Sequence, residues 1–431
     1  GGAEAKQPKK PLPVAVEARF KERITAKLES SLDVALGHLA WALGVTDSQQ
    51  AAGEELFAPG YELDLGGEGA GRWRSRCEDD IDTSRDSSSL CAVHKMQALT
   101  AFCEVPGAAE YHRKGVSRLL RRLFGKRETI VAGLGIKRSL LPIGNGMEAW
   151  MAEQPQGSGV YDVAVTVHAA AMLAVVQCAS ALGDREMLGE INSWFAALEK
   201  AYPRSTWKHQ SFHLNGILWE SLVVISSKIR SDSSLAEDLE EFIVDLESYM
   251  QAIFNEDPQV WSFSAARAAV MSWASAKKAA RRKRLGVAVD EYMRRWVELI
   301  PKFSFNVSYS CGPLQGVAPL LHKRGEQAAE LVGSVLKMME KDVDLFQVAG
   351  SSSSDAEGSR SLAAERLGLP VLSAHGQLEG SFYRDEAQLR SEKRATLRID
   401  DTAQCVLALS RTLALLDELV GVDVGAGQGG E

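Results

Sequence analysis

The sequence predicts an all-α protein arranged as an α/α toroid, which is a ring of helical hairpins with few or no strands. Three observations predict this class. Apolar residues recur at spacings of three and four in nearly every apolar segment, and the period-two alternation of strands is nearly absent. A short turn followed by an apolar helix also recurs weakly near residues 71–99, 159–176 and 380–409. A chain of 431 residues is long enough for one such ring.

The elements are expected in the following order. Residues 1–13 are polar and rich in Lys and Pro, and are expected to be disordered. A long helix follows from about Val14 to Leu43 and ends at Gly44, and the Gly-rich stretch 52–71 is a loop. Further helices are predicted at 86–103, 110–124, 160–182, 186–200, 212–230, 235–254, 262–280, 286–299, 313–322, 325–346 and 400–420.

Several boundaries carry local signals. Asp184 and Ser234 suit helix starts, because their side-chain oxygens can accept bonds from free backbone amides, and Gly183 suits a helix end. Residues 350–361 are rich in Ser, Gly and Asp, so a mobile surface loop is expected there. Residues 421–431 are expected to be a flexible tail, which leaves 14–420 as a single toroid domain.

The overall charge excludes some functions. A net charge of -8 argues against a general nucleic-acid binder, which needs an excess of Lys and Arg. The basic run Lys277–Arg284 could hold an anion or a membrane headgroup, or it could be a solvated helix end. No apolar run is judged long enough to cross a membrane, and Gly1–Pro13 has no apolar centre of the kind found in secretory signals.

The cysteine pattern predicts free thiols. The six cysteines stand at 77, 91, 103, 178, 311 and 405, and none form a CxxC pair. Their density is too low for a disulfide scaffold. We therefore expect mostly free thiols and favour a reducing intracellular compartment or organelle.

The segment near the C-terminus carries a family resemblance. Gly380-Ser381-Phe382, followed after some residues by Ile399-Asp400-Asp401-Thr402-Ala403, resembles the repeat of terpenoid cyclases and protein prenyltransferase β subunits, which are α/α toroids. In the protonation-initiated cyclases an Asp-x-Asp-Asp-Thr-Ala motif supplies the general acid, and Asp400 matches the proton donor. Arg398 replaces the first Asp of that motif. An arginine beside the acid stabilises its ionised form, so Asp400 is expected to be a weaker proton donor.

A second resemblance concerns metal binding. Glu78, Asp79 and Asp82 are similar in spacing to the aspartate-rich motif of ionisation-type terpene synthases, where carboxylates hold Mg²⁺ on a diphosphate. The resemblance implies a magnesium site. The alternative is an acidic cap before the helix expected at 86, and no second magnesium motif is evident later in the chain.

A third resemblance points to carbohydrates. Ser211–Trp219 resembles a segment of the glucuronyl C5-epimerases, which also contain an α/α ring, and Tyr309–Gly316 is fainter in its similarity to another. The order of these two segments is reversed here. The resemblance implies a glycan that contains uronate.

Polar residues at the starts of inner helices are the candidate site residues, because these starts face the centre of a toroid. Asp400, Asp401 and Arg398 are the candidate catalytic group, with an acid or base carboxylate oriented by the arginine. The alternative is a helix cap with a salt bridge. The candidate substrate-binding residues are His168, His213, Asn215, Tyr309 and Gln315, although His168 could equally be a hydrogen-bonded core histidine.

Three functions remain open. The first is an enzyme with an acidic cavity that transforms an isoprenoid-like or other apolar small molecule. The second is a uronate epimerase or polysaccharide lyase, and the third is a non-catalytic scaffold or assembly subunit. The lining of the centre distinguishes them, since a charged groove favours a glycan and a filled centre favours a scaffold. An apolar lining would favour an isoprenoid, with aromatic candidates Trp73, Trp150, Trp219, Trp261 and Phe382.

Overall fold

The computed structural model describes residues 12–46, 62–64, 73–74, 91–125, 159–209, 212–229, 234–256, 263–303, 311, 314–315, 326–347, 381–382 and 396–422. The all-α prediction is confirmed, because helices make up most of these residues and the strands are short. The helices are α1 (Ala18–Ala42), α4 (Cys91–Glu104), α5 (Ala108–Tyr111), α6 (Arg113–Gly125), α9 (Gly159–Leu182), α10 (Arg185–Ala201), η2 (Arg204–His209), α11 (Phe212–Lys228), α12 (Ser234–Glu256), α13 (Phe263–Ser275), α14 (Ala279–Phe303), α16 (Glu326–Phe346) and α19 (Ile399–Glu418). The strands are β1 (Leu12–Glu17), β2 (Glu62–Asp64), β3 (Trp73–Arg74), β4 (Thr396–Arg398) and β5 (Leu419–Val422).

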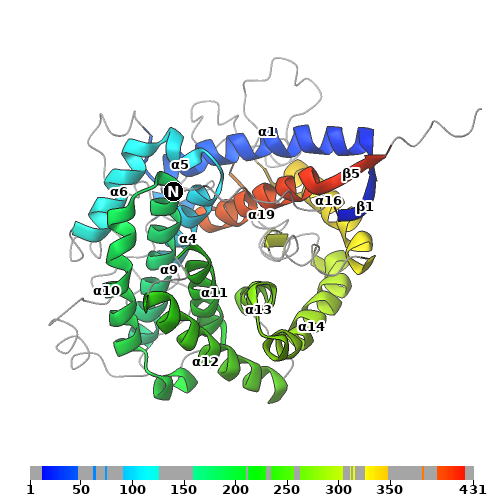
Figure 1. Cartoon of the computed structure of the whole chain (residues 1–431). Helices are drawn as coiled ribbons and strands as arrows, with labels where there is room; N and C mark the ends of the chain where they lie inside the picture. Colours follow the sequence, from blue (N-terminus) through cyan, green and yellow to red (C-terminus); the bar gives the residue numbers. More distant parts are fainter. Residues whose placement is uncertain are drawn as a thin grey trace, which may run out of the picture.

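An inner layer of helices follows the order α13, α11, α9, α4 and α19, with each packed against the next (Figure 1). The neighbouring helices α9, α4 and α19 run in the same direction. Cys103 and Cys178, near the C-terminal ends of α4 and α9, are bonded to each other. Glu104 at the end of α4 likewise pairs with Arg411 in the second half of α19. The inner helices α4, α9 and α19 therefore begin at the same end of the molecule.

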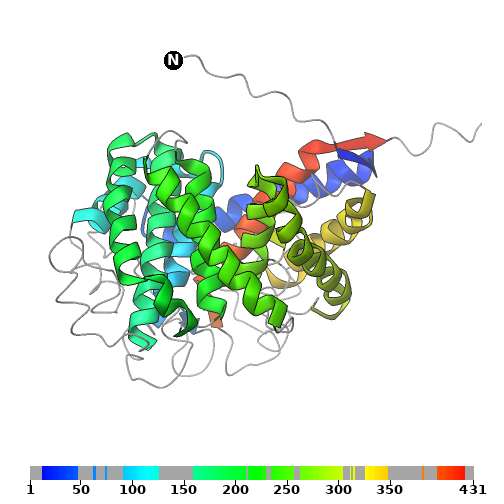
Figure 2. The same ribbon diagram turned by 60° about the horizontal axis from the view of Figure 1, so that its bottom comes forward.

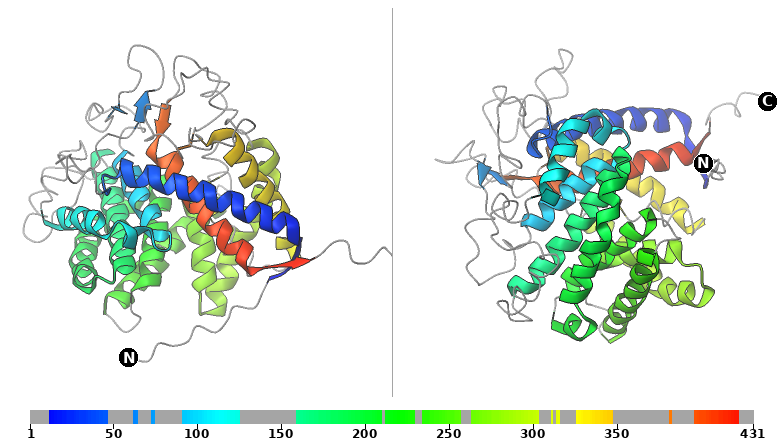
Figure 3. Two further views of the ribbon diagram at one scale, coloured as in Figure 1. Left: turned by 90° about the horizontal axis from the view of Figure 1, so that it is seen from above. Right: turned by 60° about the vertical axis from the view of Figure 1, so that its left-hand side comes forward.

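An outer layer covers the inner one. Helix α10 packs on α9, α12 on α11, α14 on α13, and α1 on α19 (Figures 1 and 2). Helix α16 lies beside α1, where Lys27 pairs with Asp344 and Arg23 pairs with Glu340 (Figure 3). This alternation of outer and inner helices is the arrangement expected for stacked helical hairpins.

The connections between the two layers are unequal in length. Inner helices lead to outer ones through short turns, such as 183–184 between α9 and α10 and 276–278 between α13 and α14. Three of the returns to an inner helix are long segments, at 43–90, 126–158 and 347–398, whereas α10 leads to α11 and α12 leads to α13 through the shorter segments 202–211 and 257–262. We call the end where the inner helices begin the loop-bearing end. Connections much longer than about 12 residues within a compact fold commonly carry function.

A small sheet links two of these long connections. It has the order β3-β2-β4, with β2 antiparallel to both neighbours, and Glu62 is paired in register with Arg398. Strand β4 continues directly into α19. The sheet thus joins the first long connection to the start of the last inner helix at the loop-bearing end.

The closed toroid remains a prediction. The segment that would complete the inner layer between α14 and α16 is described only at Cys311 and at residues 314–315. These residues lie against α19, because Cys311 is bonded to Cys405 and the Gln315 side chain donates to the carbonyl oxygen of Gln404 at 3.3 Å. Helices α4, α9 and α19, which follow the three weakly related sequence segments, are consecutive in the inner layer.

The predictions for the two ends of the described chain were wrong. Leu12 and Pro13 lie in β1 rather than in a disordered segment, and α1 starts at Ala18 rather than Val14. Strand β5 includes residues 419–422, where a helix end and a flexible tail were expected. The reason is that β1 and β5, which lie at opposite ends of the described chain, pair as parallel strands. Local periodicity carries no signal for a pairing between segments so far apart in the sequence. Residues 1–11 and 423–431 lie outside the described residues, as does 350–361.

Several helix boundaries are confirmed. Gly44 and Gly183 end their helices with φ of 67° and 68°, a conformation that glycine adopts without strain. The Asp184 carboxylate accepts a hydrogen bond from the Met187 amide at 3.2 Å and so begins α10. The predicted break between 280 and 286 is wrong, since α13 ends at Ser275 and α14 begins at Ala279.

Helix α9 contains an apolar window that the sequence prediction overlooked. By length and composition Val165–Leu182 could cross a membrane, with a mean hydropathy of 1.7. However, 83% of this window is buried inside the protein, against α4, α10 and α11. A helix that is apolar on all sides is expected in the centre of a large fold, and α9 occupies that position.

The prediction of free thiols was wrong for the cysteines whose side chains the structure describes. Cys103 is bonded to Cys178, and Cys311 to Cys405. Each bond joins residues that are far apart in the sequence, so their spacing gave no warning. The pairing removes the basis on which a reducing compartment was expected, because disulfides persist mainly in oxidising compartments.

Candidate functional site

The start of α19 places charged residues at the loop-bearing end. Arg398 is the last residue of β4 and precedes the first residue of α19 in an extended conformation. Asp400 and Asp401 lie in the first helical turn, where negative charge is favourable near the free backbone amides. Both carboxylates are buried. The alternative of a helix cap does not hold for Asp401 or Thr402, because α19 already begins at Ile399 and Arg398 occupies the cap position.

Thr402 has a different role. Its hydroxyl oxygen accepts a hydrogen bond from the backbone amide of Phe382 at 3.1 Å. Phe382 belongs to the Gly-Ser-Phe turn, and both it and Ser381 are fully buried. The two halves of the motif that resembles the cyclase repeat are therefore in direct contact in space.

Arg398 and Asp400 form a bidentate ion pair. The Arg398 Nε donates to one carboxylate oxygen at 3.0 Å and Nη2 donates to the other at 2.9 Å. The Asp400 side chain is only 2% exposed, and that of Arg398 is 15% exposed. A guanidinium held in this geometry stabilises the ionised carboxylate. Asp400 is therefore suited to orienting other groups rather than to donating a proton.

His94 completes the cluster from the neighbouring helix. It lies in the first turn of α4, with its Nδ1 at 3.4 Å from Arg398 Nη2 and 3.6 Å from the nearer Asp400 oxygen. Its side chain is 14% exposed, so it is more accessible than Asp400. Residues 94 and 398 are 304 positions apart, and only the packing of α4 against α19 brings them together.

This arrangement can transfer protons. A histidine changes charge near neutral pH, and a neighbouring carboxylate or arginine selects which ring nitrogen carries the proton. If Nδ1 accepts from Arg398, then Nε2 carries the proton and can donate a hydrogen bond. If Nδ1 carries the proton toward Asp400, then Nε2 carries the lone pair and can act as a base.

The other predicted substrate-binding residues do not join this cluster where their side chains are described. His168 is 1% exposed, shares a hydrogen bond with the carbonyl oxygen of Trp194 at 2.9 Å and stacks on the Trp194 ring. It lies between inner helix α9 and outer helix α10. This is the position of a core histidine.

The side chains of Asn215 and Gln315 form hydrogen bonds that join neighbouring segments of the chain. The Asn215 carbonyl oxygen accepts from the Tyr202 hydroxyl at 2.6 Å, and its amide donates to the Trp207 carbonyl at 3.2 Å. These bonds fasten η2 to the start of α11. Gln315 fastens its segment to α19, as described above, and both side chains are buried.

The remaining predicted site residues lie outside what the structure describes. Glu78, Asp79, Asp82 and Tyr309 are outside the described ranges, and only the backbone of His213 is described, within α11. Among the described residues no group of three or more His, Cys, Asp or Glu side chains could hold a metal. The magnesium site thus stays a prediction.

The other end of the contact between α4 and α19 contains a second arginine–carboxylate pair. Arg411 of α19 donates through Nε and Nη2 to the Glu104 carboxylate at 2.7 and 3.0 Å, and through Nη1 to the Gln315 carbonyl at 2.7 Å. Burial alone would raise the pKa of Glu104. The charge and hydrogen bonds of Arg411, with a contribution from Lys228, hold the pKa of Glu104 below its ordinary value.

A third pair continues this network. Arg267 of α13 donates to both oxygens of Glu220 on α11, at 2.5 and 2.8 Å. The charge of Glu220 also reaches Arg411 and helps to raise its pKa, although burial acts in the opposite direction. Since α11 and α19 are separated in the inner layer by α9 and α4, these side chains extend toward its concave side. The described part of the centre is therefore charged.

The basic run in α14 is partly neutralised. Arg281 and Arg284 both donate to Glu247 of α12, which is fully buried. Burial lowers the pKa of Arg281, but the hydrogen bonds and charges of Glu247 and Glu240 outweigh this and raise it. The run therefore serves partly to join two outer helices.

The aromatic candidates do not line a central cavity where they are described. Phe382 is fully buried beside α19, and Trp219 lies between the inner and outer layers. Only the backbone of Trp73 is described, in β3, and Trp150 and Trp261 are outside the described ranges.

Comparison with known proteins identifies no relative. No protein-family model matches the chain, and no curated protein or solved structure is significantly similar to it.

The sequence analysis missed His94 and the central ion pairs. His94 lies between Val93 and Met96, so the helix was interpreted only by its apolar residues. The neighbouring Lys95 is also fully buried, which is rare for lysine. Adjacent ionisable residues at an inner helix start were the available signal for this site.

Proposed function

We propose that the protein is an enzyme that transfers protons at the loop-bearing end of the inner helices. His94 is the proton-transfer group, and Asp400 and Arg398 are the groups that orient it. The observation that carries this proposal is the contact of His94 with the Arg398–Asp400 ion pair. A partly exposed histidine beside a buried carboxylate is a common arrangement for acid–base catalysis.

The substrate proposed is a glycan that contains uronate. Inner helices begin at this end, and helix N-termini carry partial positive charge that favours an anionic group such as a carboxylate. The described centre is charged rather than aromatic. The reaction proposed is removal of the proton beside the uronate carboxylate, as in an epimerase or a lyase.

The isoprenoid hypothesis has less support. It requires Asp400 to donate a proton, whereas both of its oxygens accept from Arg398. The scaffold hypothesis is supported by one observation, namely the ion pairs of Arg411 and Arg267 on the concave side of the inner layer. Such pairs would fill the centre of a non-catalytic ring.

The test is proton exchange in heavy water. The protein is incubated with uronate-containing glycans, and loss of the C5 proton signal is followed by NMR, together with formation of any unsaturated product. Exchange is expected with the unaltered protein and is expected to fall about a hundredfold or more in His94→Asn.

The matched control is His112→Asn. His112 lies between α5 and α6 and contacts the rings of Phe102 and Tyr111 rather than the Arg398–Asp400 pair, so the same substitution there should leave exchange unchanged. Equal exchange in His94→Asn and the unaltered protein would remove His94 from the mechanism. Absence of exchange with every uronate glycan would move the scaffold hypothesis ahead.

A further inference from the structure

The start of α14 carries a cluster of exposed cations. Six of the eight residues from 277 to 284 are Lys or Arg. Two of them, Arg281 and Arg284, are paired with the buried carboxylate of Glu247. The other four are exposed and form no ion pair with any residue that the structure describes. We call them the α14 cationic cluster: Lys277, Lys278, Arg282 and Lys283.

Backbone hydrogen bonds hold this cluster together. Lys277 and Lys278 lie in the turn between α13 and α14. The Arg282 guanidinium donates to the carbonyl oxygen of Ala276 at 2.6 Å, and the Arg282 backbone amide donates to that of Lys278 at 3.0 Å. These bonds tie the turn to the first turn of the helix, so little backbone freedom is lost when the cations meet an anionic partner. The free amides at the start of α14 add partial positive charge.

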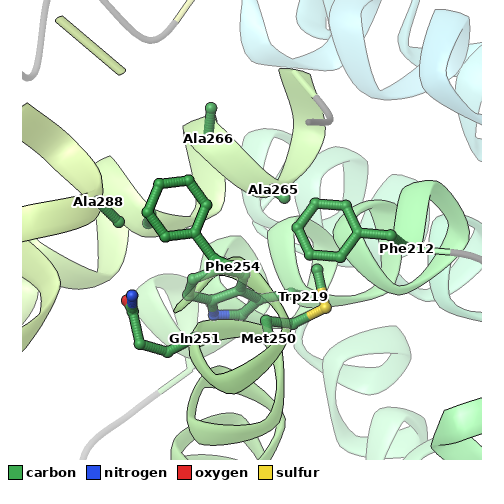
Figure 4. Close-up of a pocket in the computed structure, with 9 residues that line it drawn as sticks. Phe212, Trp219, Met250, Gln251, Phe254, Ala265, Ala266 and Ala288 are labelled. Carbon is green, nitrogen blue, oxygen red and sulfur yellow. The ribbon is translucent and has the colours of Figure 1, made fainter. Parts of the chain in front are cut away.

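An exposed apolar side chain stands beside the cluster. Val287 is 60% exposed and follows Lys283 by four residues, so the two side chains share one face of α14. The opposite face is buried through Leu285 and Val289. Figure 4 shows Ala288, the next residue along the helix, at a small apolar pocket that α14 shares with α11, α12 and α13. Val287 is therefore directed toward solvent rather than into the core.

The described parts of the chain have one other exposed large apolar side chain, Tyr111, which is 86% exposed. Its surroundings are different. Tyr111 contacts the ring of His112 and lies beside the ion pair of Arg113 with Glu110, which has no net charge. Val287 instead lies next to four cations that no described carboxylate neutralises.

We propose that the α14 cationic cluster docks the protein on an anionic lipid bilayer. The Lys and Arg side chains meet the lipid phosphates, and Val287 enters the boundary between the headgroups and the acyl chains. Because the whole chain has a net charge of -8, the bilayer repels most of its surface and attracts this one, which orients the protein with α14 toward the membrane. A soluble polyanion is the alternative partner, but it has no apolar phase to receive Val287.

The experiment measures sedimentation of the full chain, with its disulfides intact, on sucrose-loaded vesicles. The vesicles contain either phosphatidylcholine alone or phosphatidylcholine with phosphatidylglycerol. Binding is expected to the anionic vesicles only. It is expected to weaken as the salt concentration rises, because salt screens the attraction between exposed charges.

Substitutions separate the two parts of the surface. Lys277→Gln combined with Lys283→Gln should weaken binding to anionic vesicles about thirtyfold, since each cation near an anionic bilayer contributes roughly fivefold. Val287→Ser removes apolar contact but no charge, and should weaken the same binding roughly threefold or more. Thermal melting confirms that each variant is folded.

The matched control is Lys114→Gln combined with Arg121→Gln. It removes the same charge from exposed positions of α6, which lies on the other side of the molecule from α14 (Figures 1 and 2). Vesicle binding by this variant should remain close to that of the unaltered protein. An equal loss in the α6 and α14 double variants would show a general effect of net charge and would overturn the proposal.

Three other results would also contradict a bilayer as the partner. They are equal binding to neutral and anionic vesicles, vesicle binding that Val287→Ser leaves unchanged, and binding to soluble polygalacturonate without binding to vesicles. The inference does not depend on proton transfer at His94. The α14 variants should keep the proton exchange of the unaltered protein, and His94→Asn should keep its vesicle binding, so the two proposals fail separately.

Discussion

The contact between α4 and α19 has an arginine–carboxylate pair near each end, and the two pairs are built differently. At the loop-bearing end, Arg398 and Asp400 belong to the same short segment, and His94 reaches them from α4. At the other end, Glu104 of α4 pairs directly with Arg411 of α19. The first pair contacts a partly exposed histidine, whereas the second joins two helices.

The surroundings of the two pairs also differ, because one is cross-linked and the other is not. Glu104 follows Cys103, which is bonded to Cys178 of α9, and Arg411 also donates to the Gln315 carbonyl. The loop-bearing end is bordered by long connections instead. One end is cross-linked, and the other presents a partly accessible ionisable group. In an enzyme this division lets the stability of the fold and the chemistry depend on different residues.

The largest effect is expected from removing the disulfide beside Glu104. Replacing Cys103 and Cys178 by alanine should lower the free energy of unfolding by about 3–4 kcal/mol, because the bond closes a loop with a sequence separation of 75. Urea denaturation of the oxidised proteins measures this. The rate of substrate proton exchange should change little in the folded variant. A large loss of exchange would contradict the proposal that the disulfide end and the His94 end have different roles.

The next effect concerns the pair itself. Glu104→Gln leaves the Arg411 guanidinium without its charged partner, so unfolding should become easier by about 2–3 kcal/mol, less than for a fully buried pair because both side chains are partly exposed. Asp344→Asn removes an exposed partner of Lys27 and should cost less than about 1 kcal/mol. Equal losses in the two variants would argue against a special role for Glu104.

The effect of Glu104 should depend on pH. Its folded-state pKa lies below the ordinary value of 4.5, so the folded protein binds fewer protons than the unfolded chain around that pH. This stabilisation is complete above about pH 4.5 and is lost as the pH falls through the folded-state pKa. The difference in stability between the unaltered protein and Glu104→Gln should therefore shrink in acid, as urea denaturation at a series of pH values would show.

The smallest effect on stability is expected at the loop-bearing end. The Asp400 carboxylate is more buried than that of Glu104, but its pair joins residues two positions apart rather than two helices, and Asn keeps one oxygen acceptor, so Asp400→Asn should make unfolding easier by about 1–2 kcal/mol. The same change should misorient His94 and reduce proton exchange by roughly tenfold or more. If Asp400→Asn loses more stability than Glu104→Gln but keeps its exchange rate, then the two ends do not differ as proposed.

Much of the helical architecture could be predicted from local sequence. The helix predicted at 325–346 is observed at Glu326–Phe346, and that predicted at 186–200 is observed at Arg185–Ala201. These elements have one buried face, so their apolar spacing reports the helix directly. Gly183 and Asp184 marked a helix boundary because both act on the adjacent backbone. Gly183 has no side chain and adopts a positive φ, and the Asp184 carboxylate accepts from a free backbone amide.

The candidate site could be predicted only in part. Arg398 and Asp400 were found because they are close together in the sequence and stand at a helix start. His94 was not, because its role depends on a residue 304 positions away. His168 and Asn215 were selected as polar residues at inner helix starts, but they satisfy neighbouring backbone or side-chain groups instead.

By itself, the sequence determined that this protein is helical, where most of its helices begin and end, and which short segment would bring Arg398 beside Asp400. These properties depend on residues within a few turns of one another. Only the tertiary structure decided that β1 pairs with β5, that Cys103 bonds to Cys178, and which histidine meets Asp400. Such contacts join residues from distant parts of the chain, and their free energy is gained only when the layers pack, so no local pattern records them.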